Sequence, residues 1–156
     1  MGDIHSSLET WRFGTLDSSD AESVSAIDCA MFSNGFEVKQ VRVEIESGLG
    51  RAVWIQQQLA GYLLARRDGD LLEVTRLAVV PSFQRAGVAQ ALLDMLIRDE
   101  NDAQYLTLHV LKENAGALRL YLKNGLHIVG EDGLSWVMQK SLRDGAEDAL
   151  FLKVRE

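Results

Sequence analysis

The chain has 156 residues, 47% of them hydrophobic and 25% charged, and carries a formal net charge of −7. This composition argues against a disordered chain and predicts one globular domain over residues 1–156, with residues 1–10 as a candidate disordered tail. The acidic charge without a basic stripe argues against nucleic acid as a partner, and no apolar run is long enough to span a membrane.

The N-terminal third of the chain predicts a strand and a helix, followed by an ambiguous stretch. Residues 11–16 alternate as in a short strand, and residues 17–32 place apolar side chains at helical spacing after capping serines and aspartates. The single cysteine, Cys29, excludes an internal disulfide, fits a reducing cytoplasm, and is expected to be buried as a small hydrophobe. Residues 38–50 stay open between helix and strand because β-branched side chains weaken the helical pattern.

Three strands are expected between Arg51 and Val80, arranged as an antiparallel meander. The first two are joined at Gln57-Gln58, a very short link that is typical of a hairpin. Asp68-Gly69-Asp70 provides the next turn, and residues 71–80 form the last strand of the meander.

After the meander, helical and strand patterns alternate. Helices are expected over residues 87–100 and 114–125, and strands over residues 105–111, 126–142 and 148–154. Because strands separated by helices need crossover connections, at least one pair must be parallel. The fold class is therefore α+β with a mixed sheet.

Several common catalytic signatures do not occur in the sequence. The histidines and the cysteine lack the spacing of metal ligands, so no metal is expected. A nucleophile elbow and a P-loop lysine are absent as well.

The segment Gln84–Gln90 lies where a predicted strand gives way to a predicted helix. Amides at a helix N-terminus have no intrahelical acceptor, and the helix dipole places partial positive charge there. Ala86, Gly87 and Ala89 are small enough to let an anion approach the backbone. These residues alone predict either an anion site or a plain strand-to-helix turn.

The pattern Gln84-x-x-Gly87-x-Ala89 resembles the acyl-CoA pyrophosphate loop, Q/R-x-x-G-x-G/A, of the GNAT N-acetyltransferase superfamily. A second pattern, from Asn114 through Tyr121 to Gly125, is similar to the family's second signature. Residues 144–154 resemble the closing strand of the ribosomal-protein alanine N-acetyltransferase branch. The resemblance covers residues 71–154, and before that only the order of elements agrees.

The resemblance implies a single-domain, mixed and mostly antiparallel sheet of six to seven strands, flanked by about four helices and splayed between strands 4 and 5. Acetyl-CoA would bind in that opening, with its pantetheine arm on the fourth strand and its pyrophosphate on the loop. The implied cofactor-binding residues are Leu77, Ala78, Val79, Gln84, Arg85, Ala86, Gly87, Val88, Ala89, Gln90, Asn114 and Tyr121.

Transfer of an acetyl group to an amine needs a base, donors for the oxyanion and an acid for the thiolate. The resemblance implies that Tyr121 is the acid and that the Val79 N–H is an oxyanion donor; the alternative is that Tyr121 packs in the core. Asn114 is also a good helix N-cap, and capping and cofactor contact could coexist. For the base, Glu73, His109 and a water relay stay open.

The resemblance implies an acetyl-CoA-dependent N-acetyltransferase whose primary-amine acceptor attacks directly in a ternary complex. Trp136 stands where the alanine branch has a tyrosine-rich stretch, and it either walls the substrate site or simply packs. Peptide N-termini are therefore not assured as acceptors. The alternatives are a silent acyl-CoA-binding regulatory module and a nucleotide-phosphate binder. A cytoplasmic location is expected, and a homodimer is a candidate state because dimers are common in the family.

Overall fold

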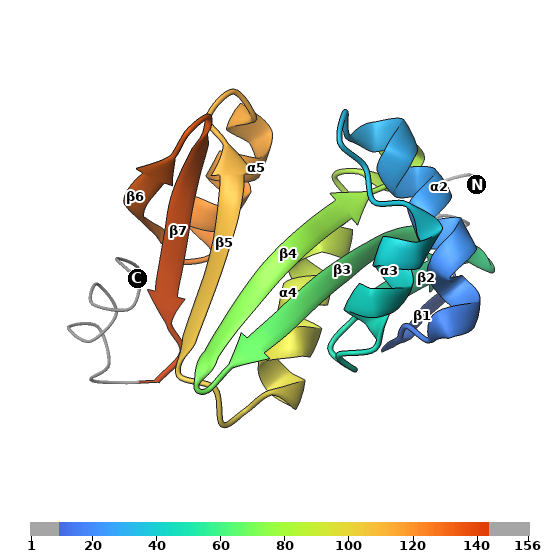
Figure 1. The fold of residues 1–156 in the computed structure, drawn as a ribbon, viewed down its shortest axis with the longest axis horizontal. Coiled ribbons are helices and arrows are strands. Elements are labelled where there is room, and N and C mark those ends of the chain that lie inside the picture. The colour runs from blue at the N-terminus through green and yellow to red at the C-terminus, as the bar shows by residue number, and fades with distance from the viewer. Residues whose placement is uncertain (1–9, 144–156) are drawn as a thin grey trace, which may run out of the picture. The chain divides into compact units, whose positions relative to one another are not determined.

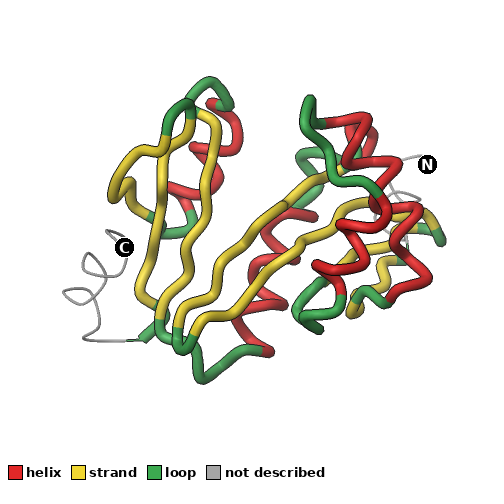
Figure 2. The backbone as a smooth tube through the Cα atoms, in the orientation of Figure 1, coloured by secondary structure: helices red, strands yellow, loops and turns green. Residues whose placement is uncertain are grey.

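The computed structural model describes residues 10–143. Its elements, shown in Figures 1 and 2, are β1 (Trp11–Thr15), η1 (Ser18–Asp20), α2 (Ala21–Met31), α3 (Val38–Ile45), β2 (Arg51–Ile55), β3 (Gln58–Asp68), β4 (Leu71–Val79), η2 (Pro81–Phe83), α4 (Val88–Asp99), β5 (Tyr105–Leu111), α5 (Ala115–Lys123), β6 (His127–Asp132) and β7 (Ser135–Ser141). The closing strand predicted over residues 148–154 lies outside the described residues, and so does the tail predicted over residues 1–10, apart from Thr10.

The strands form one sheet in the order β1-β2-β3-β4-β5-β7-β6. β4 and β5 are parallel, with residues 71–74 of β4 in register with residues 105–108 of β5. The pairs β1–β2, β2–β3, β5–β7 and β6–β7 are antiparallel. The predicted class, a mixed and mostly antiparallel sheet with four α-helices, is confirmed.

The chain divides into two compact units. The first contains the described part of residues 1–65 together with residues 76–99, and the second contains residues 66–75 together with the described part of residues 100–156. The strand β4 contributes its N-terminal half to the second unit and its C-terminal half to the first. The prediction of one domain over residues 1–156 stays a prediction.

In the first unit, α2 and α3 cover one face of β3 and β4, and α4 lies on the other face (Figure 1). Fully buried apolar side chains from α2, α3 and the sheet form a core cluster that includes Val24, Val41, Ala52 and Leu64. A capping box at Asp17 and Asp20 opens the helical region, which agrees with the predicted capping. Residues 38–45, left open between helix and strand, form α3, because Val41 and Ile45 pack on the core at helical spacing.

Two local predictions in this unit are wrong. The β2–β3 turn consists of Gln56 and Gln57, both left-handed with φ of 51° and 71°, so the link lies one residue earlier than predicted. Cys29 is exposed rather than buried. The neighbouring Asp28 occupies the buried position of α2. Successive side chains of a helix are rotated by about 100°, so Cys29 points away from the core.

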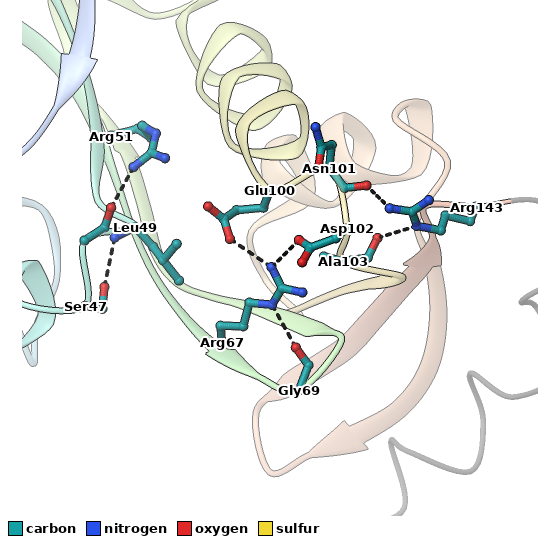
Figure 3. A network of polar contacts seen from close by, with 11 residues as sticks. Ser47, Leu49, Arg51, Arg67, Gly69, Glu100, Asn101, Asp102, Ala103 and Arg143 are labelled. Atoms are coloured by element: carbon teal, nitrogen blue, oxygen red, sulfur yellow. Dashed lines mark hydrogen bonds and ion pairs between the residues drawn. The ribbon is translucent and has the colours of Figure 1, made fainter.

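The second unit contains β5, β7 and β6, with α5 packed behind β5 (Figure 1). A cluster of polar contacts ties its connections together, as Figure 3 shows. Arg67 lies 2.9 Å from Glu100 and 2.7 Å from Asp102, and its Nε donates to the Gly69 carbonyl at 2.8 Å. The guanidinium holds the pKa of the Asp102 carboxyl below its usual range. Arg143 donates to the carbonyls of Asn101 and Ala103.

No helix within residues 10–143 is both long enough and apolar enough to cross a membrane.

Candidate active site

The loop from β4 to α4 presents a run of backbone amides without acceptors. Within the described residues, no backbone N–H from Arg85 to Gln90 donates a hydrogen bond, and the first one of α4 to do so is Ala91, to the Gly87 carbonyl at 3.0 Å. Residues 84–87 are exposed, so these amides are open to a ligand. Unpaired amides at the start of a helix attract an anion because the dipole adds partial positive charge.

The backbone of this loop has the shape of an anion-binding nest. Arg85 has φ of 68° and Gly87 has φ of 90°, so both are left-handed with Ala86 between them. Left-handed residues in a turn direct successive N–H groups toward one concavity. A left-handed non-glycine residue is uncommon, and such residues occur in tight turns, as at Gln56 and Gln57, and also cluster at functional sites.

Tight packing fixes where α4 begins. A Cβ on Gly61 of β3 would lie 2.8 Å from the Val88 side chain and 2.9 Å from the Ala78 carbonyl, so only glycine lets the helix start so close to the strand. Val88 and Leu92 are fully buried below the loop. The helix end that carries the free amides is therefore held in place by the core of the first unit.

The C-terminal half of β4 presents a backbone edge beside this loop. Val80 donates its N–H to the Ala60 carbonyl of β3 at 2.8 Å. In an antiparallel ladder the direction of the groups alternates, so the N–H and C=O of Val79 and Leu77 point away from β3. The Gln84 side chain donates to the Val79 carbonyl at 3.1 Å and thereby closes the loop onto this edge. The side chain of Ala78 packs in the core cluster.

The other predicted site residues lie in the second unit. Asn114 caps α5 by accepting the Ala117 N–H at 3.1 Å, which leaves its amide nitrogen available. Tyr121, two turns further on, is only 7% exposed. Burial raises the pKa of Tyr121 well above its ordinary value, so the phenol stays protonated. No described residue forms a hydrogen bond with its hydroxyl, which is therefore free to donate to a ligand.

Glu73 and His109 share one face of the second unit's sheet. Glu73 is in register with Thr107 on β5, and His109 is two residues further along the same strand. Side chains two residues apart on a strand point to the same face. His109 Nε2 lies 3.5 Å from the Asp132 carboxylate, and 44% of its side chain is exposed. The structure thus brings the two candidate bases to one surface.

Trp136 lies on the opposite face from His109. It is in register with Val110, and the neighbouring Val137 is in register with His109. The ammonium of Lys112 lies 4.6 Å from the centre of the Trp136 ring and also pairs with Glu131. The ring is half-buried and held by a cation–π contact.

Two polar features were missed at the level of sequence. Gln139 is in register with Thr107 and 1% exposed, and its Oε1 has no hydrogen-bond partner within residues 10–143. Asp28 is fully buried with Arg76 as its partner. Asp28 could have been noticed, because a carboxylate four residues after Val24 falls on the predicted apolar face of α2.

The model of the acetyltransferase (GNAT) family matches residues 21–126, more than half of the chain. The chain belongs to this family. The predicted resemblance is therefore confirmed, and the matched region includes the loop of Arg85–Gln90 and the segment from Asn114 to Tyr121.

One similar curated protein is the N-alpha-acetyltransferase daf-31 of Caenorhabditis elegans. It is 33% identical over 109 residues, which is 58% of this chain and 58% of the relative. The chain thus spans only a little more than half the length of the curated relative that it matches.

Solved structures of several acetyltransferases share the fold. Ard1 from Thermoplasma volcanium has a TM-score of 0.78 at 17% identity, covering 86% of this chain and 99% of that one. The ribosomal-protein-S18-alanine N-acetyltransferase from Escherichia coli has a TM-score of 0.77 at 20% identity, covering 89% of this chain and 98% of that one. PaiA N-acetyltransferase from Thermoplasma acidophilum, in complex with coenzyme A, has a TM-score of 0.76 at 17% identity, covering 85% of this chain and 99% of that one.

Proposed function

We propose that the protein transfers an acetyl group from acetyl-CoA to a primary amine, by direct attack in a ternary complex. The observation that carries this proposal is the run of acceptor-free amides from Arg85 to Gln90 at the start of α4. In a chain of the GNAT family, the pyrophosphate of acetyl-CoA is the anion that fits this nest. A neighbour with the same fold was solved with coenzyme A.

The pantetheine arm would lie along the free edge of β4. The outward N–H and C=O groups of Leu77 and Val79 can pair with its amides as an added strand would. The Val79 N–H would then face the thioester carbonyl and donate to the oxyanion that forms there. Asn114 and Tyr121, on the second unit, stay proposed cofactor contacts.

The chemistry requires an acid for the leaving thiolate and a base for the amine. Tyr121 suits the acid role because its raised pKa keeps the phenol protonated and its hydroxyl has no competing partner in the described residues. Glu73 and His109 remain alternative bases, together with a water relay held on the surface that they share. Trp136 stays the weakest of the proposed contacts, because its ring is engaged by Lys112.

The α-amino groups of peptides are the first acceptors to test. The Caenorhabditis elegans relative is an N-alpha-acetyltransferase. An α-amine also has a pKa of about 8, compared with about 10.4 for lysine, so a larger fraction is neutral and able to attack at pH 7.

The experiment is acetyl-CoA turnover with a panel of peptides, lysine derivatives, polyamines and amino sugars, monitored by release of free thiol. Thiol release that depends on one class of amine supports the proposal and names the acceptor. Binding of acetyl-CoA without thiol release from any amine would instead favour a silent regulatory module. Calorimetry with CoA and ATP adds a second check, since tighter binding of ATP would contradict acyl-CoA as the ligand.

Glu73→Gln and His109→Gln separate the candidate bases. The variant that removes the base should lower kcat/KM for the acceptor by about 100-fold or more. If both variants keep wild-type rates, neither side chain is the base and the water relay remains.

A further inference from the structure

A buried charge pair in the first unit is not used by the chemistry proposed above. Asp28 on α2 is fully buried, and 14% of the Arg76 side chain on β4 is exposed. Arg76 Nε lies 3.0 and 3.1 Å from the two carboxylate oxygens, and its Nη2 lies 3.0 Å from Oδ2. Tyr62 donates its hydroxyl to Oδ1 at 2.5 Å. The carboxylate is thus held by donors from two neighbouring strands.

The same pair holds the connection between α2 and α3, residues 32–37. The Phe36 N–H donates to Asp28 Oδ2 at 2.7 Å. Arg76 Nη2 donates to the Asn34 carbonyl at 3.1 Å. The guanidinium carbon also lies 4.4 Å from the ring centre of Phe32 and 4.0 Å from that of Phe36. A connection without secondary structure is therefore fixed at three of its residues by one arginine and its partner.

Steric packing fixes this connection independently of the charges. A Cβ on Gly35 would lie 2.5 Å from the Cys29 Cα and 2.7 Å from the Asp28 carbonyl oxygen. Both are backbone atoms of α2 and cannot move aside. Ser25 also donates to the Phe36 carbonyl at 2.8 Å. The connection therefore packs tightly against the backbone of α2 at Gly35.

The cost of burying the Asp28–Arg76 pair indicates that the pair specifies a conformation and adds little to stability. Removing two charges from water costs about as much as their attraction returns, so apolar side chains of similar size would stabilise the fold at least as well. A buried pair is better suited to specifying one conformation. Here the specified conformation is that of residues 32–37, beside the arrowhead of β4 (Figure 1).

We propose that Arg76 is a positioning residue for the acceptor amine, acting through Asp28 on residues 32–37. Arg76 directly precedes Leu77–Val79, the edge assigned above to the pantetheine arm and the oxyanion. The clamped connection is a preformed wall next to that edge, against which the acceptor is oriented before it attacks. This inference rests on the proposed acetyl transfer.

Two independent variants test it. The double variant Asp28→Asn/Arg76→Gln removes both charges but keeps polar groups of similar size. Gly35→Ala displaces the connection sterically and leaves the charge pair intact. The matched control is Arg12→Gln, because Arg12 lies in the same unit and stacks on Trp54 at 4.0 Å but is exposed. The readouts are KM for the acceptor, kcat, acetyl-CoA affinity by calorimetry and the cooperativity of thermal unfolding.

Both test variants should raise KM for the acceptor by about tenfold or more, with acetyl-CoA affinity within about twofold of wild type. Arg12→Gln should leave KM unchanged. The proposal is wrong if KM is unchanged in the two test variants, if acetyl-CoA affinity falls by the same factor as KM rises, or if neither variant folds, since the clamp is then only structural. Absence of turnover by the wild-type protein would refute the proposed function and this inference together.

Discussion

At the scale of single residues, Tyr121 makes the most direct link between structure and chemistry. It is buried on α5, its phenol stays protonated, and no described residue competes for its hydroxyl. A protonated hydroxyl in this setting can donate to a thiolate as the carbon–sulfur bond breaks. The alternative role, simple packing, needs only the ring and not the hydroxyl.

Tyr121→Phe should therefore lower kcat by about 100-fold and change the KM for acetyl-CoA by less than about twofold, because the hydroxyl acts in the transition state. Steady-state kinetics with the preferred acceptor measure both quantities. Tyr105→Phe, at another buried tyrosine of the same unit, serves as the control and should keep kcat within about threefold. A fully active Tyr121→Phe enzyme would show that this residue only packs.

The residue scale also shows where sequence reasoning reached its limit. The pattern of small residues made an anion loop one of two predictions, beside a plain turn, because size and helix-end position are local properties of Ala86, Gly87 and Ala89. The hydrogen-bonding partner of Arg76 could not be predicted, since Asp28 lies 48 positions away in the chain and only the fold brings the two side chains close. Cys29 was predicted to be buried, but it is exposed. The apolar face of α2 was predicted from Val24 and its neighbours, and this placed the buried position one residue too late in the helix, at Cys29 and not at Asp28.

At the scale of elements, the start of α4 is the proposed anchor for the pyrophosphate. Its backbone, rather than any side chain, provides the donors, so a change in backbone conformation should affect binding most. Gly87 is left-handed and a Cβ on it would meet nothing within 4 Å, and the same is true of Gly69 in the β3–β4 turn. Both glycines therefore need a left-handed backbone, but only Gly87 lies in the proposed pyrophosphate loop.

Gly87→Ala should weaken binding of acetyl-CoA by about tenfold, because alanine disfavours the left-handed backbone that aims the amides. Gly69→Ala is the matched control and should leave the affinity unchanged, with a similar small loss of stability. Isothermal calorimetry gives the affinities, and urea unfolding gives the stabilities. Equal affinities for the two variants would mean that the nest does not bind the cofactor.

The helix α5 depends for stability on its N-cap residue, Asn114, which directly precedes the helix. Asn114→Ala removes the cap on the Ala117 N–H and should lower the free energy of unfolding by about 1 kcal/mol, as measured in urea. Asn114→Ser should keep most of the free energy of unfolding, because serine is also a good N-cap. If only acetyl-CoA affinity changes and the stability does not, Asn114 contacts the cofactor and contributes nothing as a cap.

The limits of element prediction have identifiable causes. Strands β2 to β4 and helices α4 and α5 were predictable because each shows a clear period, and β3 and α5 also end at recognisable turn residues, Gly69 and Gly125. Residues 38–45 were ambiguous because Val38, Val41 and Val43 suit either structure, and the core decides for a helix. The β2–β3 turn was displaced by one residue because two glutamines in a left-handed turn carry no turn signal.

At the scale of the whole molecule, burial of tyrosines links stability to high pH. Burial raises the pKa of Tyr62, aided by its hydrogen bond to Asp28, and raises that of Tyr121. The folded state therefore binds these protons more tightly than the unfolded chain, whose tyrosines titrate near pH 10. Their contribution to stability is complete below about pH 10 and is lost as the pH rises above it.

The free energy of unfolding should accordingly fall above pH 10, by about 1.4 kcal/mol per pH unit for each of Tyr62 and Tyr121. Tyr121→Phe should remove one such contribution to the slope. Urea unfolding between pH 8 and 11 measures it, with the range below pH 9 as the reference. Identical slopes for the wild type and Tyr121→Phe would contradict the assigned pKa shift.

The most direct test of the central claim is mass spectrometry of an acceptor peptide incubated with the protein and acetyl-CoA, with free thiol measured in parallel. The account predicts an acetyl group on the α-amine and an equal amount of released thiol, both strongly reduced in Gly87→Ala at limiting acetyl-CoA. Acetyl-CoA binding with neither acetylated product nor thiol, across the whole amine panel, would contradict it.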